Sequence, residues 1–338
     1  MLQRRDVDVR EGAKRAVHIP HTMLAAAVDR FGGPEVLTIH ALPVPPVGPR
    51  EVLMAVDTAG VGPWDLEIRE GKIPSRKPRF PLVLGVDGAG VVMAVGSRVR
   101  RLKVADRVYS YNWANPKGGF YSEYVVVPAD KVGRVPKRLD LEHAGAIATT
   151  GLTALQGIDG HLRVQRGEFV IVHGGSGGVG TLAIQFAKLR RAKVLATASG
   201  VDGLELVREM GADLAVDSRH QDVAAAARRF APHGIDAVLA LAGADALDNA
   251  LAAVRSGGRV AYPNGVEPAP KKRRGVKFIP YDGVPGVREF ERLNRAVTSA
   301  KLKVPISERF PLADAAKAHE HLAAGHVLGK TVLRIRQA

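Results

Sequence analysis

The sequence feature that most constrains the fold is a glycine-rich turn between a buried strand and a helix. Residues 169–173 read Phe-Val-Ile-Val-His, and a Gly-Gly-Ser-Gly-Gly-Val-Gly run then leads into an amphipathic segment ending at Lys188. Gly175, Gly177 and Gly180 have the G-x-G-x-x-G spacing. In that motif the first glycine permits a tight turn, the second lets the backbone approach a pyrophosphate, and the third lets the helix pack closely on its strand. The helix N-terminus offers unpaired N–H groups to phosphates. The run therefore predicts a dinucleotide-binding unit.

Length and patterning predict two domains, because 338 residues exceed one ordinary core. We expect residues 1–22 to be a disordered extension, since they carry no core pattern. Residues 23–148 show short β-like runs separated by Gly and Pro, which is typical of a compact, mostly antiparallel β domain. Residues 149–283 alternate strand-like and helix-like segments, which predicts a doubly wound parallel sheet. Residues 284–338 are expected to return and complete the first domain, with the site in the cleft between the two.

Six strands are expected in the nucleotide-binding part, at 169–173, 193–197, 213–216, 236–241, 258–262 and 276–281. The last of these should lie at a sheet edge. An apolar edge strand invites pairing with a second copy of the chain.

Composition excludes several classes of function. The chain has no cysteine, which rules out disulfides, cysteine-ligated metals and a cysteine nucleophile, and which fits a cytoplasmic location. No apolar run approaches the length of a membrane span. The net charge of +15 is spread along the chain apart from one basic run at 271–274. That pattern makes nucleic-acid binding an unlikely function and should mainly attract anionic ligands.

Several further motifs follow one another in a characteristic order. They are Phe-Gly-Gly-Pro-Glu-Val-Leu at 31–37, Pro-Leu-Val-Leu-Gly-Val-Asp-Gly-Ala-Gly-Val-Val at 81–92, Ala-Asp-Arg-Val at 105–108, Gly-Gly-Phe-Tyr-Ser-Glu-Tyr-Val at 118–125, Thr-Gly-Leu-Thr-Ala at 150–154 and Gly-Lys-Thr-Val-Leu at 329–333. From Met23 to the C-terminus, the sequence resembles the zinc-independent quinone oxidoreductase branch of the medium-chain dehydrogenase/reductase superfamily. The resemblance implies a GroES-like β domain around a Rossmann-like domain, hydride transfer in the cleft, and a homodimer or larger assembly.

The metal ligands of the zinc-dependent members are missing. Those members use a cysteine and a His-Glu pair, but Val86 and Asp87 stand at the position of the pair, and the histidines show no metal-ligand spacing. We therefore expect no zinc. Without a Lewis acid, alkoxide stabilisation for alcohol oxidation is hard to arrange, whereas reduction of a conjugated carbonyl is easier.

The choice of cofactor depends on the end of the second Rossmann strand. An NAD enzyme places an acid there to accept from the ribose 2′-OH, but this chain has Ala198 and Ser199. Arg219 matches a position near the adenosine ribose, while Gly203 and Ser218 replace the usual phosphate-clamping lysine and tyrosine. NADP(H) is therefore predicted over NAD(H). The resemblance implies cofactor contacts from Gly62, Pro63, Asp65, Thr153, Gly175, Ser176, Gly177, Gly178, Val179, Gly180, Thr197, Ser199, Arg219, Leu241, Ala242, Gly243 and Asn264.

The substrate side is less defined by the sequence. Candidate pocket residues are Trp64, Asp87, Tyr109, Asn112 and Trp113, and candidate catalytic residues are Asp65, Tyr109 and Tyr111. The aromatic side chains could equally pack the β domain. Ile73 occupies the position of the proton-donating tyrosine of related enoyl reductases, which argues against an acyl-chain substrate.

The sequence thus predicts an NADPH-dependent reductase of quinones or small enones. Two alternatives stay open: an alcohol or aldehyde dehydrogenase-like enzyme of the same fold, and a non-catalytic protein that binds the cofactor or RNA.

Overall fold

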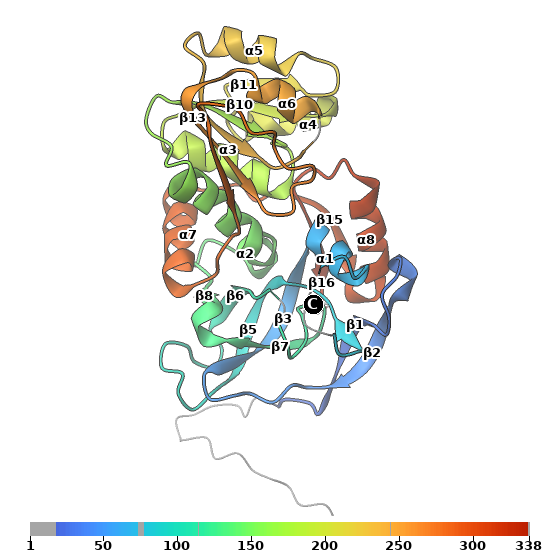
Figure 1. The fold of residues 1–338 in the computed structure, drawn as a ribbon. Helices are drawn as coiled ribbons and strands as arrows, with labels where there is room; N and C mark the ends of the chain where they lie inside the picture. The colour runs from blue at the N-terminus through green and yellow to red at the C-terminus, as the bar shows by residue number, and fades with distance from the viewer. Residues whose placement is uncertain (1–17, 74–77, 114, 244, 337–338) are drawn as a thin grey trace, which may run out of the picture.

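The computed structural model describes residues 18–73, 78–113, 115–243 and 245–336, and it shows two domains stacked end to end (Figure 1). The expected N-terminal extension lies outside the described residues up to position 17. Residues 18–21 lead directly into the first strand, β1 (Thr22–Val28).

The upper domain in Figure 1 is built on a six-stranded parallel sheet with the strand order β11-β10-β9-β12-β13-β14. Each predicted strand is confirmed to within a few residues, and the last one lies at the sheet edge as predicted. The order reverses between β9 and β12, and ligands of such sheets bind outside the carboxyl ends of the strands at that point. The elements are β9 (Phe169–His173), β10 (Lys193–Ala198), β11 (Leu214–Asp217), β12 (Ile235–Ala240), β13 (Val254–Pro263), β14 (Lys277–Tyr281), α3 (Gly178–Leu189), α4 (Gly200–Glu209), α5 (Val223–Phe230) and α6 (Asp245–Leu251).

The lower domain holds a three-stranded sheet and a seven-stranded, mostly antiparallel sheet. Strand β16 of the C-terminal segment pairs with β3, so the chain returns to this domain after the upper sheet. Its elements are β1, β2 (Leu37–Pro43), β3 (Glu51–Val61), α1 (Pro63–Arg69), β4 (Leu82–Val83), β5 (Asp87–Val95), β6 (Arg107–Tyr111), β7 (Tyr124–Pro128), β8 (Val132–Arg134), α7 (Val287–Ala300), β15 (Ile306–Pro311), α8 (Ala315–Ala324) and β16 (Lys330–Arg334).

The helix α2 (Leu141–Leu155) joins the two domains, and the sequence pattern did not predict it. Every residue from Ala144 to Leu155 is buried, so the helix lacks the polar face that reveals an amphipathic helix in a sequence. It packs on α3 of the upper domain and on β3 and β5 of the lower one, and one hydrophobic core continues through it. The domain boundary that we expected at 148/149 falls inside this helix.

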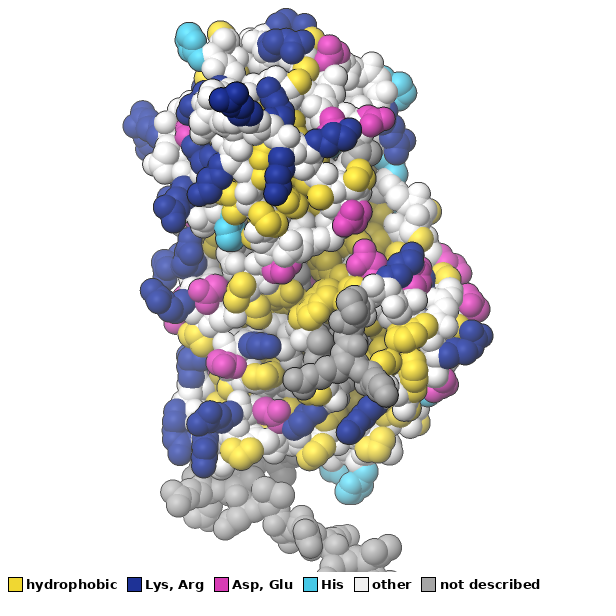
Figure 2. Space-filling view, in the orientation of Figure 1, with side chains coloured by type: hydrophobic (Ala, Val, Ile, Leu, Met, Phe, Trp, Pro, Cys, Tyr) yellow, Lys and Arg dark blue, Asp and Glu magenta, His cyan; other side chains and the backbone are white. Residues whose placement is uncertain are grey.

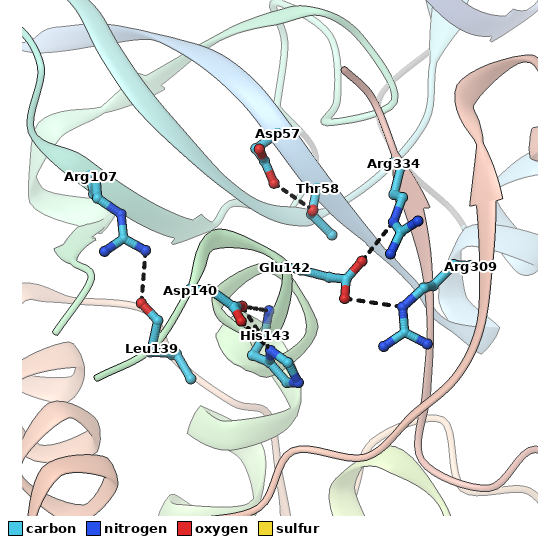
Figure 3. A network of polar contacts seen from close by, with 9 residues as sticks. All are labelled: Asp57, Thr58, Arg107, Leu139, Asp140, Glu142, His143, Arg309 and Arg334. Atoms are coloured by element: carbon cyan, nitrogen blue, oxygen red, sulfur yellow. Dashed lines mark hydrogen bonds and ion pairs between the residues drawn. The ribbon is translucent and has the colours of Figure 1, made fainter. Parts of the chain in front are cut away.

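The start of α2 is fixed to the lower domain by polar contacts (Figure 3). Asp140 caps the helix by accepting a hydrogen bond from the backbone N–H of His143. Glu142 accepts from Arg334 on β16 at 2.7 Å and from Arg309 on β15 at 3.0 Å. The N-terminal end of α2 is therefore held by the lower domain, while the helix also packs on α3 of the upper domain.

Candidate active site

A cavity of about 860 Å³ lies between the two domains. The upper domain contributes the start of α3 and the loops after β12, β13 and β14. The lower domain contributes the start of α1, the end of β6 and the start of β16. The expected site residues that line the cavity are Gly62, Pro63, Trp64, Tyr111, Trp113, Thr153, Gly177, Gly178, Val179, Gly180, Leu241 and Asn264. Ile73 also lines it.

The glycine turn forms the upper wall of the cavity. A Cβ on Gly180 would lie 2.2 Å from the Gly174 carbonyl oxygen, so only glycine fits there. A Cβ on Gly177 would meet nothing closer than 3.8 Å, and no side chain caps the first N–H groups of α3. The backbone therefore leaves an open cradle at a helix N-terminus, which fits a pyrophosphate.

One detail of the turn differs from the sequence interpretation. The left-handed residue is Gly174, with φ of +80°, and not Gly175. Gly175 is needed for close packing instead, because its Cβ would lie 3.0 Å from the Cβ of Ala196 on β10.

Thr197 and His173 support the turn from beneath. The Thr197 side chain accepts from the Gly174 N–H at 3.0 Å, and its carbonyl accepts from the Gly175 N–H at 2.7 Å. The His173 Nδ1 atom lies 3.0 Å from the Thr197 hydroxyl, and burial lowers the pKa of His173 to about 4. Thr197 is buried and does not line the cavity, so its part in the site is to hold the turn in place.

The far end of the nucleotide site begins where β10 ends, at Ala198. Arg219 is exposed in the loop after β11. Asp202, at the first turn of α4, is the carboxylate that follows the strand tip. Both of its oxygens are contacted by the His326 Nε2 atom, at 2.9 and 3.1 Å. Because His326 belongs to the loop before β16, this pair ties the lower domain to the upper one.

Two expected substrate-pocket residues are corrected by the structure. Tyr109 is fully buried, donates a hydrogen bond to Asn294 Oδ1 at 2.7 Å and stacks edge-on against Phe290. It therefore packs the domain and is no longer a catalytic candidate. Asn112 is also buried, and its side-chain oxygen accepts from Lys131 Nζ. Tyr111, the last residue of β6, and Trp113, in the loop that follows it, line the cavity.

Asp65 and Asp87 lie directly behind the cavity wall, and both are fully buried. Asp65 Oδ2 accepts from the Gly62 N–H at 2.8 Å, and Asp87 Oδ2 accepts from the Thr149 N–H at 3.0 Å. Burial raises the pKa of Asp65 to about 7, the charge of Asp87 adds to this effect, and Lys330 opposes it. Lys330 was not among the expected site residues. The sequence feature that could have identified Lys330 as a site residue is its position in the Gly-Lys-Thr-Val-Leu motif at 329–333.

Asp65, Asp87 and Lys330 together form a floor behind the cavity wall, and a chain of buried polar side chains continues from it. Arg69 lies 3.0 Å from His319 Nδ1, and the Tyr121 hydroxyl lies 3.2 Å from His319 Nε2. Arginine can only donate, so Nδ1 accepts and Nε2 carries the hydrogen that is donated to Tyr121. Burial, with a smaller contribution from Arg69, lowers the pKa of His319 to about 3 and keeps the ring neutral.

Two comparisons with known families and proteins agree with this geometry. Residues 48–137 match the family "Alcohol dehydrogenase GroES-like domain", and residues 210–333 match "Zinc-binding dehydrogenase". The quinone oxidoreductase of Lama guanicoe is 33% identical, covering 93% of this chain and 98% of its own. The chain belongs to the quinone oxidoreductase branch of the medium-chain dehydrogenase/reductase superfamily. It is an NAD(P)H-dependent oxidoreductase with a Rossmann-like and a GroES-like domain.

Further relatives and solved structures are similar to this chain over most of its length. The chloroplastic NADPH-dependent alkenal/one oxidoreductase of Arabidopsis thaliana is 32% identical, covering 93% of this chain and 80% of its own. A structure titled as an NAD-dependent alcohol dehydrogenase has a TM-score of 0.87 at 33% identity, and a mycobacterial protein solved with NADPH has a TM-score of 0.81 at 30% identity. Each of the two covers 93% of this chain and 100% of its own.

The zinc in the second family's name does not fit the donor atoms of this oxidoreductase. Over the part of the chain that the structure describes, no group of three or more His, Cys, Asp or Glu side chains is arranged so that it could hold a metal ion. Val86 and Asp87 stand at the position of the usual ligand pair, and one oxygen of the buried Asp87 carboxylate accepts from the Thr149 N–H. Within the same residues, no helix is long and apolar enough to cross a membrane.

Proposed function

We propose that the chain is a zinc-independent, NADPH-dependent reductase of quinones or small conjugated carbonyl compounds. The observation that carries this proposal is the cleft itself, in which an uncapped helix N-terminus faces a wall that includes Trp64, Tyr111 and Trp113. A bound nicotinamide cofactor supplies the hydride. The aromatic wall suits a flat acceptor, and the carboxylates of the floor do not provide a metal site to bind an alkoxide.

The preference for NADPH is supported by the end of β10. No carboxylate stands at Ala198 or Ser199 to accept from a ribose 2′-OH, and the Asp202 carboxylate is already contacted by His326. Arg219 is exposed next to this end and can pair with a 2′-phosphate. Gly203, which packs against Ala198, leaves the phosphate without the lysine that related enzymes use.

The experiment that tests the function is a substrate panel with both cofactors. Purified protein treated with a chelator should oxidise NADPH in the presence of para-benzoquinones or short enones, and should prefer NADPH to NADH. Oxidation of alcohols with NAD as the main activity would instead support the dehydrogenase alternative, which the similarity to an NAD-dependent alcohol dehydrogenase favours. Zinc in stoichiometric amounts, with loss of turnover on its removal, would contradict the zinc-independent mechanism.

We further propose a homodimer formed through the exposed edge of the upper sheet. Strand β14 has a paired neighbour only on the β13 side among the described residues, and unpaired N–H and C=O groups at such an edge favour pairing with a second copy. Light scattering at micromolar concentration tests this, and a monomer would contradict it. The Lys and Arg side chains are spread over the face shown in Figure 2, which favours attraction of an anionic cofactor over a dedicated nucleic-acid surface.

A further inference from the structure

Buried polar atoms without a hydrogen-bond partner gather behind the cavity wall. In the part of the chain that the structure describes, seven buried side-chain N or O atoms lack a partner, and five of them belong to Trp64, Asp65, Asp87, Thr149 and Lys330. Buried polar groups are nearly always satisfied in folded proteins. Such a concentration next to the cleft therefore indicates groups kept available for a ligand or for proton transfer.

Lys330 stands between the two carboxylates and the cavity. Its ammonium lies 5.0 Å from the centre of the Trp64 ring, and atoms of both Lys330 and Trp64 line the cavity. A Cβ on Gly60 would lie 2.6 Å from Asp87 Oδ1 and 2.8 Å from Lys330 Cε, so the carboxylate and the end of the lysine face the same small space.

The charges explain why an ammonium is stable there. Desolvating a lone ammonium costs several kcal/mol, and nearby carboxylates offset that cost. The charge of Asp65 acts on Lys330, Asp87 Oδ1 faces the end of the lysine, and Lys330 Nζ has no hydrogen-bond partner among the described residues. The lysine is therefore held by charge and not locked by hydrogen bonds, and rotation of its flexible stem can carry the ammonium to the cavity wall.

We propose that Lys330 binds the carbonyl oxygen of the substrate and donates to it the proton that completes the reduction. The proposal rests on the reductase function proposed above. The hydride brings one hydrogen and two electrons to the acceptor, and the carbonyl π electrons move to oxygen. An N–H bond of the ammonium breaks as the O–H bond of the product forms. The resulting neutral amine regains its proton from solvent by way of Asp65, whose carboxylate first accepts that proton and then passes it to the amine.

The test uses a series of substituted para-benzoquinones with the full chain at saturating NADPH. Electron-withdrawing substituents make the reduced quinone a weaker base, so its oxygen needs less help from an acid. General acid catalysis contributes about 10²-fold or more. Lys330→Met should therefore slow turnover of alkyl-substituted quinones about a hundredfold, but turnover of tetrachloro-benzoquinone by no more than about threefold. A loss that is equal across the series would overturn the proposal.

Two further variants separate proton donation from structure. Lys330→Arg keeps the buried positive charge but cannot release a proton near neutral pH, so it should fold and still show the loss that depends on the substituent. Full activity of this variant with alkyl quinones would overturn the proposal even if Lys330→Met does not fold. Lys131→Met removes a second cavity lysine, which donates to Asn112, and its effect should not depend on the substituent. A wild-type protein that reduces no quinone or enone would contradict the proposed function instead.

Discussion

The two walls of the cleft are built in opposite ways. The upper wall is backbone: three glycines of one continuous run shape it, and the N–H groups of α3 supply its polarity. The lower floor is made of side chains, in which Asp65, Asp87 and Lys330 come from three separate segments and meet behind Trp64. Binding of a common cofactor needs only a backbone shape. Recognition and protonation of a particular acceptor need charged side chains at fixed positions.

The largest expected effect distinguishes two glycines of the upper wall. Gly180→Ala should destabilise the protein by about 3 kcal/mol, because its Cβ would overlap the Gly174 carbonyl. Gly177→Ala should fold with nearly unchanged stability, since its backbone has φ of -78° and the Cβ would make only an ordinary contact, 3.8 Å from the Gly174 carbonyl oxygen. It should nevertheless weaken NADPH binding about tenfold by filling the cradle. Urea unfolding and cofactor titration measure the two effects, and normal NADPH binding by Gly177→Ala would contradict the cradle.

His173, which supports the upper wall, and Asp65, behind the lower wall, should make the stability of the protein depend on pH with opposite signs. The pKa of His173 falls from 6.5 to about 4 on folding, so the unfolded chain binds the proton first and stability is lost as the pH falls through this range. The pKa of Asp65 rises from 3.8 to about 7, so the folded chain binds the proton first and stability is gained as the pH falls from about 7. Each slope is about 1.4 kcal/mol per pH unit.

Single variants reveal these slopes. Between pH 7 and 5, His173→Asn should lose less stability than the wild type, and Asp65→Asn should lose more. Urea unfolding at several pH values measures this. Exposed His233→Asn serves as the control, because solvent surrounds that side chain in both states. Parallel curves for all four proteins would show that neither buried group titrates as described.

The smallest expected effect concerns the cofactor's 2′-phosphate. Arg219→Ala should weaken NADPH binding about tenfold and leave NADH binding nearly unchanged, since one charge-assisted contact contributes about 1.5–3 kcal/mol when well formed. Ala198→Asp should reverse the preference by repelling the phosphate and accepting from the ribose 2′-OH. Arg138→Ala removes the same charge from an exposed loop of the other domain and is the control. Equal binding of NADH and NADPH by the wild type would remove the basis for a phosphate pocket here.

The sequence by itself determined the fold class, the six parallel strands and the glycine turn of the upper wall. The reason is that a glycine turn and the alternation of strand-like and helix-like segments depend on residues that are close in the sequence, such as Gly177 and Gly180. Helix α2 escaped detection because burial on all sides removes the amphipathic signal. Tyr109 and Tyr111 are two residues apart and both face inward, so only packing could decide that one stacks on Phe290 and the other lines the cleft. Lys330 reached the floor only because β16 pairs with β3, far from it in sequence. Tertiary structure decided the chemistry of the floor, because charges that act together there are separated by up to 265 residues along the chain.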